Sequence, residues 1–458
     1  MNGPSPDLRC QHAVPTASWL LKAGPDPDPD PDPDPDGRQG SHVSRFLFVV
    51  PPLTGHTNPT VAVGAALHDR GHAVAWTGHA KVIRPLLPEG AQLIPVSDDP
   101  EDDDPALAAA RQRAQGLRGA EALLFLWEDF LLPLGRSMVP GVEAAVDQFQ
   151  PDVLVVDQQA IAGAAVAQRR GLPWATSATT SAELVDPFAL LPKVGAWVAD
   201  ALSTFQADFA VSGGDVRFSS HLVLAFSTAA LAGPTRDFPA HYRFVGPSLG
   251  GRPPAVEFPW DWLDPTRRLV LVSLGTINAE AGRRFLREAV AALATMAERV
   301  QGVVVGPADL TTHVPGNVLI RGFVPQLELL GRVDAVVSHG GHNTVCEALS
   351  HGLPLVVAPI RDDQPIVAQQ VTDAGAAVRV KFGRARAADL AAAVTTVLDE
   401  PSYREAAKRL RASFQAAGGA AAAADALEAL ARSRTAARPD CRSQSPSPTK
   451  AGGPPTGP

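Results

Sequence analysis

The sequence predicts an α/β fold made of two doubly wound, Rossmann-like domains. Short β-branched apolar runs alternate with helical stretches along most of the chain, which is the pattern of parallel sheets covered by helices. The 458 residues are enough for two or three domains, and 45% of them are hydrophobic, which is ample for large cores. A segment rich in glycine and proline near the middle of the chain is typical of a linker between two halves.

We divide the chain into five parts, with a tail predicted to be disordered at each end. Six successive Pro-Asp pairs at residues 25–36 block helix formation and repel one another, and the C-terminal segment is rich in Ser, Pro and Arg. The five parts are a disordered tail at 1–44, an N-terminal domain at 45–245, a linker at 246–259, a C-terminal domain at 260–432 and a second disordered tail at 433–458.

Charge and composition exclude several classes of protein. The net charge of −8 argues against nucleic acid as a partner. No apolar run reaches the length of a transmembrane helix, so none is predicted. Two of the three cysteines lie in the polar tails, which predicts no disulfide framework and a cytoplasmic location. The acidic run at 98–104 is interpreted as a solvated loop rather than a metal site, because no histidine accompanies it.

The N-terminal domain is predicted to open with a strand at 46–50, a turn that holds His56, and a helix at 60–70. No G-x-G-x-x-G follows the strand, so a dinucleotide site is not expected there. The later elements are strands at 73–77, 151–157, 173–177, 222–226 and 242–245, and helices at 115–132, 140–149, 160–170 and 186–209.

The C-terminal domain shows the same alternation. Its predicted strands lie at 268–273, 303–305, 318–321, 333–337 and 355–360, and its helices at 279–299, 344–350, 366–374, 387–398 and 402–432, the last one broken at a Gly-Gly pair.

Residues 338–347 (Ser-His-Gly-Gly-His-Asn-Thr-Val-Cys-Glu) join a strand end, a glycine turn and a helix start. Gly340 and Gly341 let the backbone turn sharply and let a ligand approach closely. The free N–H groups and positive dipole end of the helix suit a phosphate, and His339 or His342 could donate to an anionic oxygen. The alternative is a tight turn of an α/β domain with incidental histidines.

Two other strand ends of this domain carry polar groups. A Gly-Thr pair ending at Thr276 is a candidate second phosphate contact, and Asp363 and Gln364 follow the strand at 355–360. Pro365 suits the first position of the next helix, which places both side chains at the carboxyl end of the strand, where ligands of open α/β sheets bind. One loop offers hydrogen-bond donors for a phosphate, and the next offers groups that can bind sugar hydroxyls. Together they indicate a nucleotide-sugar site.

The run from His339 to Gln364 resembles the donor-binding signature of the UDP-dependent glycosyltransferases, and is most similar to that of the bacterial macrolide and natural-product glycosyltransferases. That signature begins with His, carries Gly-x-Asn-Ser/Thr and then Glu, and ends with Asp-Gln. The resemblance extends over residues 45–430. It implies the GT-B fold, in which two Rossmann-like domains face each other across a cleft and the C-terminal helix crosses back onto the first domain.

The resemblance assigns the C-terminal domain to donor binding. Glu347 would bind ribose hydroxyls, and Asp363 and Gln364 would bind sugar hydroxyls. The residues around the diphosphate would be His339, Gly341, His342, Asn343 and Thr344, which would stabilise its charge in place of a metal.

Residues 322–326 resemble the base-recognition loop of the same family. Phe323 would stack on the base, with Val324 and Gln326 beside it. Phe323 and His342 stand where many plant members have Trp, so the choice between UDP and dTDP stays open.

The resemblance also assigns a catalytic pair in the N-terminal, acceptor-binding domain. The Gly-His-x-x-Pro spacing around His56 resembles the family's catalytic-base motif, and Asp157 matches the Asp that orients the base. Taken alone, a single His is usually structural, and an Asp at a strand end caps the next helix. Residues 125–131 form an aromatic-rich patch, to be interpreted either as core packing or as a wall of an apolar acceptor pocket.

The implied reaction is inverting transfer of a hexose, with UDP-glucose as the expected donor, to a hydroxyl of a small lipophilic acceptor such as a macrolide. The nucleotide sugar is a co-substrate, and neither a cofactor nor a metal is expected. Two alternatives from other classes are a catalytically silent nucleotide-sugar-binding partner of another transferase and a sugar-nucleotide epimerase.

Overall fold

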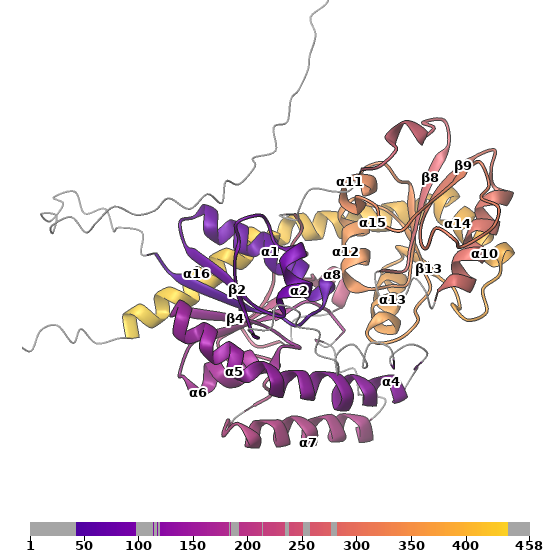
Figure 1. Cartoon of the computed structure of the whole chain (residues 1–458). Coiled ribbons are helices and arrows are strands. Elements are labelled where there is room, and N and C mark those ends of the chain that lie inside the picture. The colour runs from indigo at the N-terminus through magenta and orange to yellow at the C-terminus, as the bar shows by residue number, and fades with distance from the viewer. Residues whose placement is uncertain are drawn as a thin grey trace, which may run out of the picture.

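Two α/β domains, each built on its own parallel sheet, form the body of the chain that the structure describes (Figure 1). The structure is a computed structural model that describes residues 43–97, 113, 117, 120–182, 184, 192–212, 214–233, 238–250, 257–275 and 282–437. Most of both predicted tails, and the whole acidic run at 98–104, lie outside these ranges. None of the helices within them is long and apolar enough to cross a membrane.

The first domain is built on a seven-stranded sheet with the order β3-β2-β1-β4-β5-β6-β7 and parallel pairing throughout. Strands are added on one side of β1 and then, from β4 onward, on the other. Ligands of such sheets bind at the carboxyl ends of the strands at this switch point. The strands are β1 (Arg45–Val49), β2 (Ala73–Gly78), β3 (Gln92–Pro95), β4 (Val153–Asp157), β5 (Trp174–Ala178), β6 (Leu222–Ala225) and β7 (Tyr242–Phe244).

Alternate residues of β1 face two separate apolar layers, as the period of a strand requires. Leu47 and Val49 pack in a cluster with residues of α5, α6 and α7, whereas Phe46 and Phe48 pack with residues of α1 and α16. The helices of this domain are α1 (Thr54–Asp69), α2 (Ala80–Ile83), η1 (Arg84–Leu86), α4 (Ala120–Leu124), η2 (Phe125–Leu131), α5 (Leu132–Phe149), α6 (Ile161–Arg169), α7 (Pro192–Asp208) and α8 (Ala229–Ala232).

Two helices run through prolines at which the sequence predicted a break. α1 starts at Thr54 instead of residue 60 and contains Pro59. The helices expected at 115–132 and 140–149 form one helical stretch after Ala120, in which the π-helical η2 joins α4 to α5 and Pro140 lies inside α5. The apolar face of α5 is buried along its whole length, and this packing outweighs the helix-breaking tendency of the proline.

The second domain has a six-stranded parallel sheet with the order β10-β9-β8-β11-β12-β13, so its switch point lies between β8 and β11. The strands are β8 (Arg268–Ser273), β9 (Val300–Val305), β10 (Val318–Arg321), β11 (Ala335–Ser338), β12 (Leu355–Val357) and β13 (Ala377–Arg379). The helical elements are η3 (Trp260–Trp262), α10 (Arg283–Thr295), α11 (Gln326–Leu330), α12 (His342–Ser350), α13 (Gln364–Asp373), α14 (Ala387–Asp399), α15 (Pro401–Ala417) and α16 (Gly419–Ala437).

The last helix, α16, leaves the second domain and lies along the first, as the yellow helix of Figure 1 shows. Ala423, Leu427 and Ala431 belong to the same apolar cluster as Phe46 of β1. At its surface, Glu428 lies 3.0 Å from Nε2 of His72. The expected crossing of the C-terminal helix is therefore confirmed.

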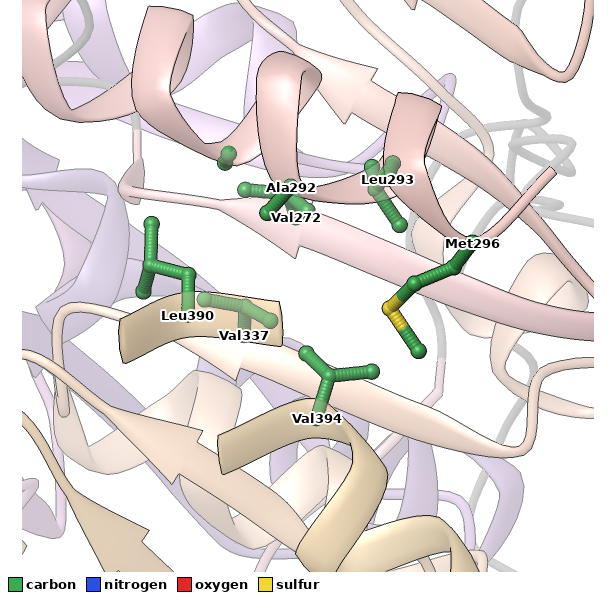
Figure 2. Close-up of a pocket in the computed structure, with 8 residues that line it drawn as sticks. Val272, Ala292, Leu293, Met296, Val337, Leu390 and Val394 are labelled. Carbon is green, nitrogen blue, oxygen red and sulfur yellow. The ribbon is translucent and has the colours of Figure 1, made fainter. Parts of the chain in front are cut away.

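A small cavity of about 10 Å³ lies in the core of the second domain, between the sheet and its helices α10 and α14 (Figure 2). Its lining is wholly apolar, and a volume of about 10–15 Å³ is needed to hold one water. The cavity is therefore a gap in core packing and not a ligand site. Its lining residues are Val272, Ala289, Ala292, Leu293, Met296, Val337, Leu390 and Val394.

Candidate active site

His56 and Asp157 meet at the switch point of the first sheet. Nδ1 of His56 lies 2.9 Å from Oδ1 of Asp157, whose side chain ends β4 and is 0% exposed. The carboxylate also accepts the backbone N–H of Gln159 at 2.9 Å and the hydroxyl of Thr179 at 3.0 Å. Because an ionised carboxylate can only accept, Nδ1 of a neutral His56 carries the proton. Nε2 is then the ring nitrogen that takes a proton in general-base chemistry.

His56 lies in the first turn of α1, not in a loop before the helix. Pro59 has no N–H to donate to the carbonyl of Gly55, four residues earlier in the helix. The side-chain amide of Asn343, from the second domain, donates to that carbonyl at 2.6 Å. The residue next to His56 is thus bound directly to the first turn of α12, which the resemblance assigns to donor binding.

The turn between β11 and α12 has the backbone that its glycines predict. Gly340 has φ of +84°, in the left-handed region that favours glycine, and Gly341 is the residue before the first turn of α12. A Cβ atom at Gly341 would lie 2.5 Å from Nε2 of His339, and one at Gly275 would lie 3.0 Å from Cε1 of the same ring. Both glycines therefore make room for the imidazole of His339, a requirement that the sequence alone did not show.

His339 is buried at the switch point of the second sheet. Burial lowers its pKa to about 4, although the charge of Asp363 and a hydrogen bond to the backbone of Ser273 oppose that shift. The ring is therefore neutral at pH 7, without formal charge, and its single N–H group can be donated either to the backbone of Ser273 or to a phosphate oxygen. The N-terminus of α12 adds its unpaired N–H groups and dipole at the same place.

Residues assigned to the nucleoside lie on α12, on the loop before α11 and at the first position of α11. Gln326 donates from Nε2 to Oε2 of Glu347 at 2.6 Å, so the structure brings these two together. Phe323 is 59% exposed, as a ring that stacks on a base must be before the base binds. The side chain of Val324 packs in the core, which makes its backbone the candidate contact, and Thr344 is buried in α12.

Asp363 and Gln364 stand at the start of α13, close to the first domain. Oδ2 of Asp363 accepts the hydroxyl of Thr180, which follows β5, at 2.7 Å. Oε1 of Gln364 accepts the backbone N–H groups of Ile360 and Arg361 at 2.9 and 3.1 Å. The Gln364 carbonyl therefore holds the loop closed, and Asp363 is tied across the interface between the domains.

The ring of His342 is directed toward the first domain. Nε2 lies 3.1 Å from the carbonyl oxygen of Phe226, and Nδ1 lies 3.2 Å from Oγ of Ser181. Within α12, Sγ of Cys346 is 3.4 Å from Nε2. Burial lowers the pKa of His342, so the ring is neutral and has one N–H group, which Nε2 donates to the carbonyl of Phe226 across the two domains.

Two candidates from the sequence remain, Thr276 and the aromatic-rich patch at 125–131. Thr276 lies outside the described residues. In the aromatic-rich patch, Trp127, Phe130 and Leu131 are buried in the apolar cluster that contains Leu47 and Val49 of β1. Their burial supports the core-packing interpretation. Within the described ranges, no group of three or more His, Cys, Asp or Glu side chains is arranged to hold a metal ion.

The sequence interpretation missed the turn after β5. Thr179 lies 2.8 Å from Nδ1 of His56, Thr180 bonds to Asp363, and Ser181 lies beside His342. Three consecutive hydroxyl residues directly after a buried strand were the available signal. Their partners lie far away in the sequence, so no local pattern could identify them.

Comparison with known proteins gives matches along most of the chain. Residues 289–430 match a family described as "Erythromycin biosynthesis protein CIII-like, C-terminal domain". The 4'-demethylrebeccamycin synthase of Lentzea aerocolonigenes is 31% identical over 422 residues, which cover 84% of this chain and 99% of that protein.

Solved structures also match across both domains. The glycotransferase of kitacinnamycin has a TM-score of 0.67 and 25% identity, and the match covers 85% of this chain and 99% of that one. A spinosyn rhamnosyltransferase complexed with thymidine diphosphate has a TM-score of 0.66 and 23% identity, and covers 84% of this chain and 100% of that one.

Proposed function

The chain belongs to the glycosyltransferases of natural-product pathways, with the GT-B fold, and from this premise we propose the reaction that it catalyses. It transfers a hexose from a nucleotide sugar, UDP-glucose first of all, to a hydroxyl of a small lipophilic acceptor. The hydrogen bond from Asn343 to the carbonyl of Gly55 carries the proposal. It sets the first turn of α12 in the second domain against Gly55, the residue next to His56 in the first.

His56 takes the proton of the acceptor hydroxyl on Nε2 as that oxygen attacks the anomeric carbon. Asp157 holds the ring through Nδ1 and stabilises the imidazolium that forms. The base belongs to the first domain and the diphosphate to the second, so the attacking and leaving oxygens lie on opposite sides of the sugar. A single displacement of this kind inverts the anomeric carbon.

The departing diphosphate gains negative charge as the glycosidic bond breaks. The N–H groups at the start of α12, the neutral ring of His339 and the side chains of Asn343 and Thr344 stabilise that charge. Glu347 holds the ribose hydroxyls, with Gln326 fixing its carboxylate. These groups are in place before the reaction, so little free energy is lost in arranging them at the transition state.

The donor sugar is a hexose with a full set of hydroxyls. Asp363 supplies a carboxylate that only accepts, and Gln364, whose carbonyl oxygen is taken by Ile360 and Arg361, supplies its amide N–H groups to adjacent hydroxyls. A deoxysugar leaves one such group unpaired, at a cost of about 1–3 kcal/mol, or roughly 5- to 150-fold in affinity. Competition assays should rank UDP-glucose above dTDP-deoxysugars. The reverse ranking would replace UDP-glucose by a dTDP-linked deoxysugar as the donor.

Release of free UDP, measured with and without a panel of lipophilic alcohols and phenols, tests the reaction class. A transferase releases UDP in proportion to glycosylated acceptor, as we expect. A silent binding partner would release none, and an epimerase would convert the sugar without releasing UDP. Either of these two outcomes would refute the proposed function.

A further inference from the structure

The turn after β5 carries three consecutive hydroxyl side chains, Thr179, Thr180 and Ser181, which are 3%, 4% and 0% exposed. We propose that this hydroxyl turn (residues 179–181) positions both halves of the active site at once. It orients the His56–Asp157 pair in the first domain and holds donor-site residues of the second. The inference rests on the proposed function, and it adds positioning residues to that reaction.

Thr179 acts on the His56–Asp157 pair. Its single hydroxyl proton is donated to Oδ2 of Asp157 at 3.0 Å, so its oxygen is left to accept from Nδ1–H of His56 at 2.8 Å. The Nδ1 proton therefore meets two acceptors, Oδ1 of Asp157 and Oγ1 of Thr179. Two acceptors fix the plane of the ring, and the bond to Oδ2 stops the carboxylate from rotating. Thr179 reaches no reacting atom in this arrangement, so it is a positioning residue.

Thr180 and Ser181 act on the other domain. Thr180 donates to Oδ2 of Asp363 at 2.7 Å, and Ser181 donates to Oε1 of Gln370 at 2.6 Å. Ala182, the next residue, is buried in an apolar cluster of the second domain. The hydroxyl turn is thus held by the donor domain on one side and by the His56–Asp157 pair on the other.

Two neighbouring residues therefore serve different steps of one reaction. Thr179 acts through the base, so its loss should change the rate and the pH dependence of proton transfer. Thr180 acts through Asp363, so its loss should change the affinity for the donor sugar. A merely structural turn would not divide its effects in this way.

The test uses the full-length chain with UDP-glucose and one accepted alcohol, and compares Thr179→Val, Thr179→Ser, Thr180→Val and Thr77→Val. Thr77→Val is the matched control. Thr77 is 0% exposed in the same domain, and its hydroxyl has no hydrogen-bond partner among the described residues. For each variant the measurements are kcat, the KM for UDP-glucose, the pH profile of kcat/KM and the thermal unfolding midpoint.

Thr179→Val should lower kcat by about tenfold or more, the effect expected when one hydrogen bond to a charged group is lost. The acid limb of its pH profile should move to lower pH, because the imidazolium loses one acceptor. Its KM for UDP-glucose should stay within about twofold of wild type, and Thr179→Ser should restore most of the rate. Thr180→Val should instead raise that KM by about 5- to 10-fold and leave the pH profile unchanged.

The inference is overturned if Thr179→Val and Thr180→Val both behave like Thr77→Val while the wild-type protein transfers glucose. It is also overturned if both variants lose activity only in proportion to lost folded protein, with the KM and the pH profile unmoved. The proposed function survives both results. Only a wild-type protein that transfers no sugar to any acceptor would remove the proposed function, and this inference with it.

Discussion

At the switch point of the first sheet the functional groups are side chains, whereas at the equivalent point of the second sheet most are backbone groups. His56, Asp157 and Thr179 form a bonded set in the first domain. In the second domain a glycine turn and the start of α12 surround the neutral ring of His339. The two sheets share one strand order, so the difference lies in the loops and not in the scaffold.

This difference fits the reaction proposed above, in which the first site supplies a base and the second holds the diphosphate. A base has to gain and lose a proton, so it needs a titratable ring with a carboxylate to stabilise the charged form. An anion site has to hold negative charge at every stage of the cycle, and fixed N–H dipoles do that without titrating. Changes to the His56–Asp157 pair should therefore alter the rate, and changes to the glycine turn around His339 should alter donor affinity.

Removing the base should give the largest effect. His56→Ala should lower kcat with an alcohol acceptor by roughly 10²–10⁴-fold, the usual contribution of positioned proton transfer. Asp157→Asn should give a smaller but clear loss, because Asp157 orients the ring and does not take the proton. UDP affinity, measured by calorimetry, should barely change in either variant. Loss of UDP binding in His56→Ala, with an unchanged rate on saturated enzyme, would place His56 in the donor site.

Crowding the glycine turn around His339 should instead weaken the binding of UDP. In Gly341→Ala the new Cβ would lie 2.5 Å from Nε2 of His339, although the backbone at Gly341 suits alanine. The ring must move, and we expect UDP affinity to fall by about tenfold, the equivalent of roughly 1.4 kcal/mol. Gly316→Ala is the matched control, since a Cβ there meets nothing within 4 Å. Equal UDP affinity in the two variants would contradict the role of the His339 ring.

The buried His339 should make the fold sensitive to acid. Its folded pKa of about 4 lies below the ordinary 6.5, so between these values the unfolded chain binds a proton that the folded chain excludes. Stability is therefore full above pH 6.5 and falls as the pH drops toward 4, by about 2 kcal/mol at pH 5 from this group. Denaturant unfolding of the wild-type protein and of His339→Asn, from pH 7.5 to 5, measures this loss of stability. The variant should show the shallower pH dependence, and equal slopes would refute the assignment.

The tails should matter least to either site. A chain of residues 44–433 keeps β1 and the apolar face of α16, whose last core member is Ala431. We expect its unfolding midpoint and its transfer rate to match those of the full chain. A large loss of thermal stability on truncation would show that the tails pack on the folded domains.

The sequence predicted the parts of the site that depend on local pattern. Asp157 ends a continuous apolar run, so its place at a strand end followed from that run. The turn at Gly340 followed from its glycines in the same way. Most central strands were found at nearly their true bounds, although β9 spans Val300–Val305 and was predicted only at 303–305. The short edge strands β3 and β13 were missed.

What the sequence could not predict depends on contacts between the domains. A proline at position 59 normally argues against a helix that starts at Thr54. The freed carbonyl of Gly55 is satisfied by Asn343, which is 288 residues away. The direction of the His342 ring is set likewise by the carbonyl of Phe226, 116 residues away. Such pairs have no signature in one sequence.

The central claim is that His56 removes the acceptor proton, and its most direct test varies the acidity of that proton. The measurement is the ratio of wild-type to His56→Ala transfer rates, at saturating UDP-glucose, for acceptors from aliphatic alcohols to phenols of low pKa. An acidic phenol needs less help to ionise, so the ratio should shrink steadily as the acceptor pKa falls. A ratio that stays constant across the series would contradict the account.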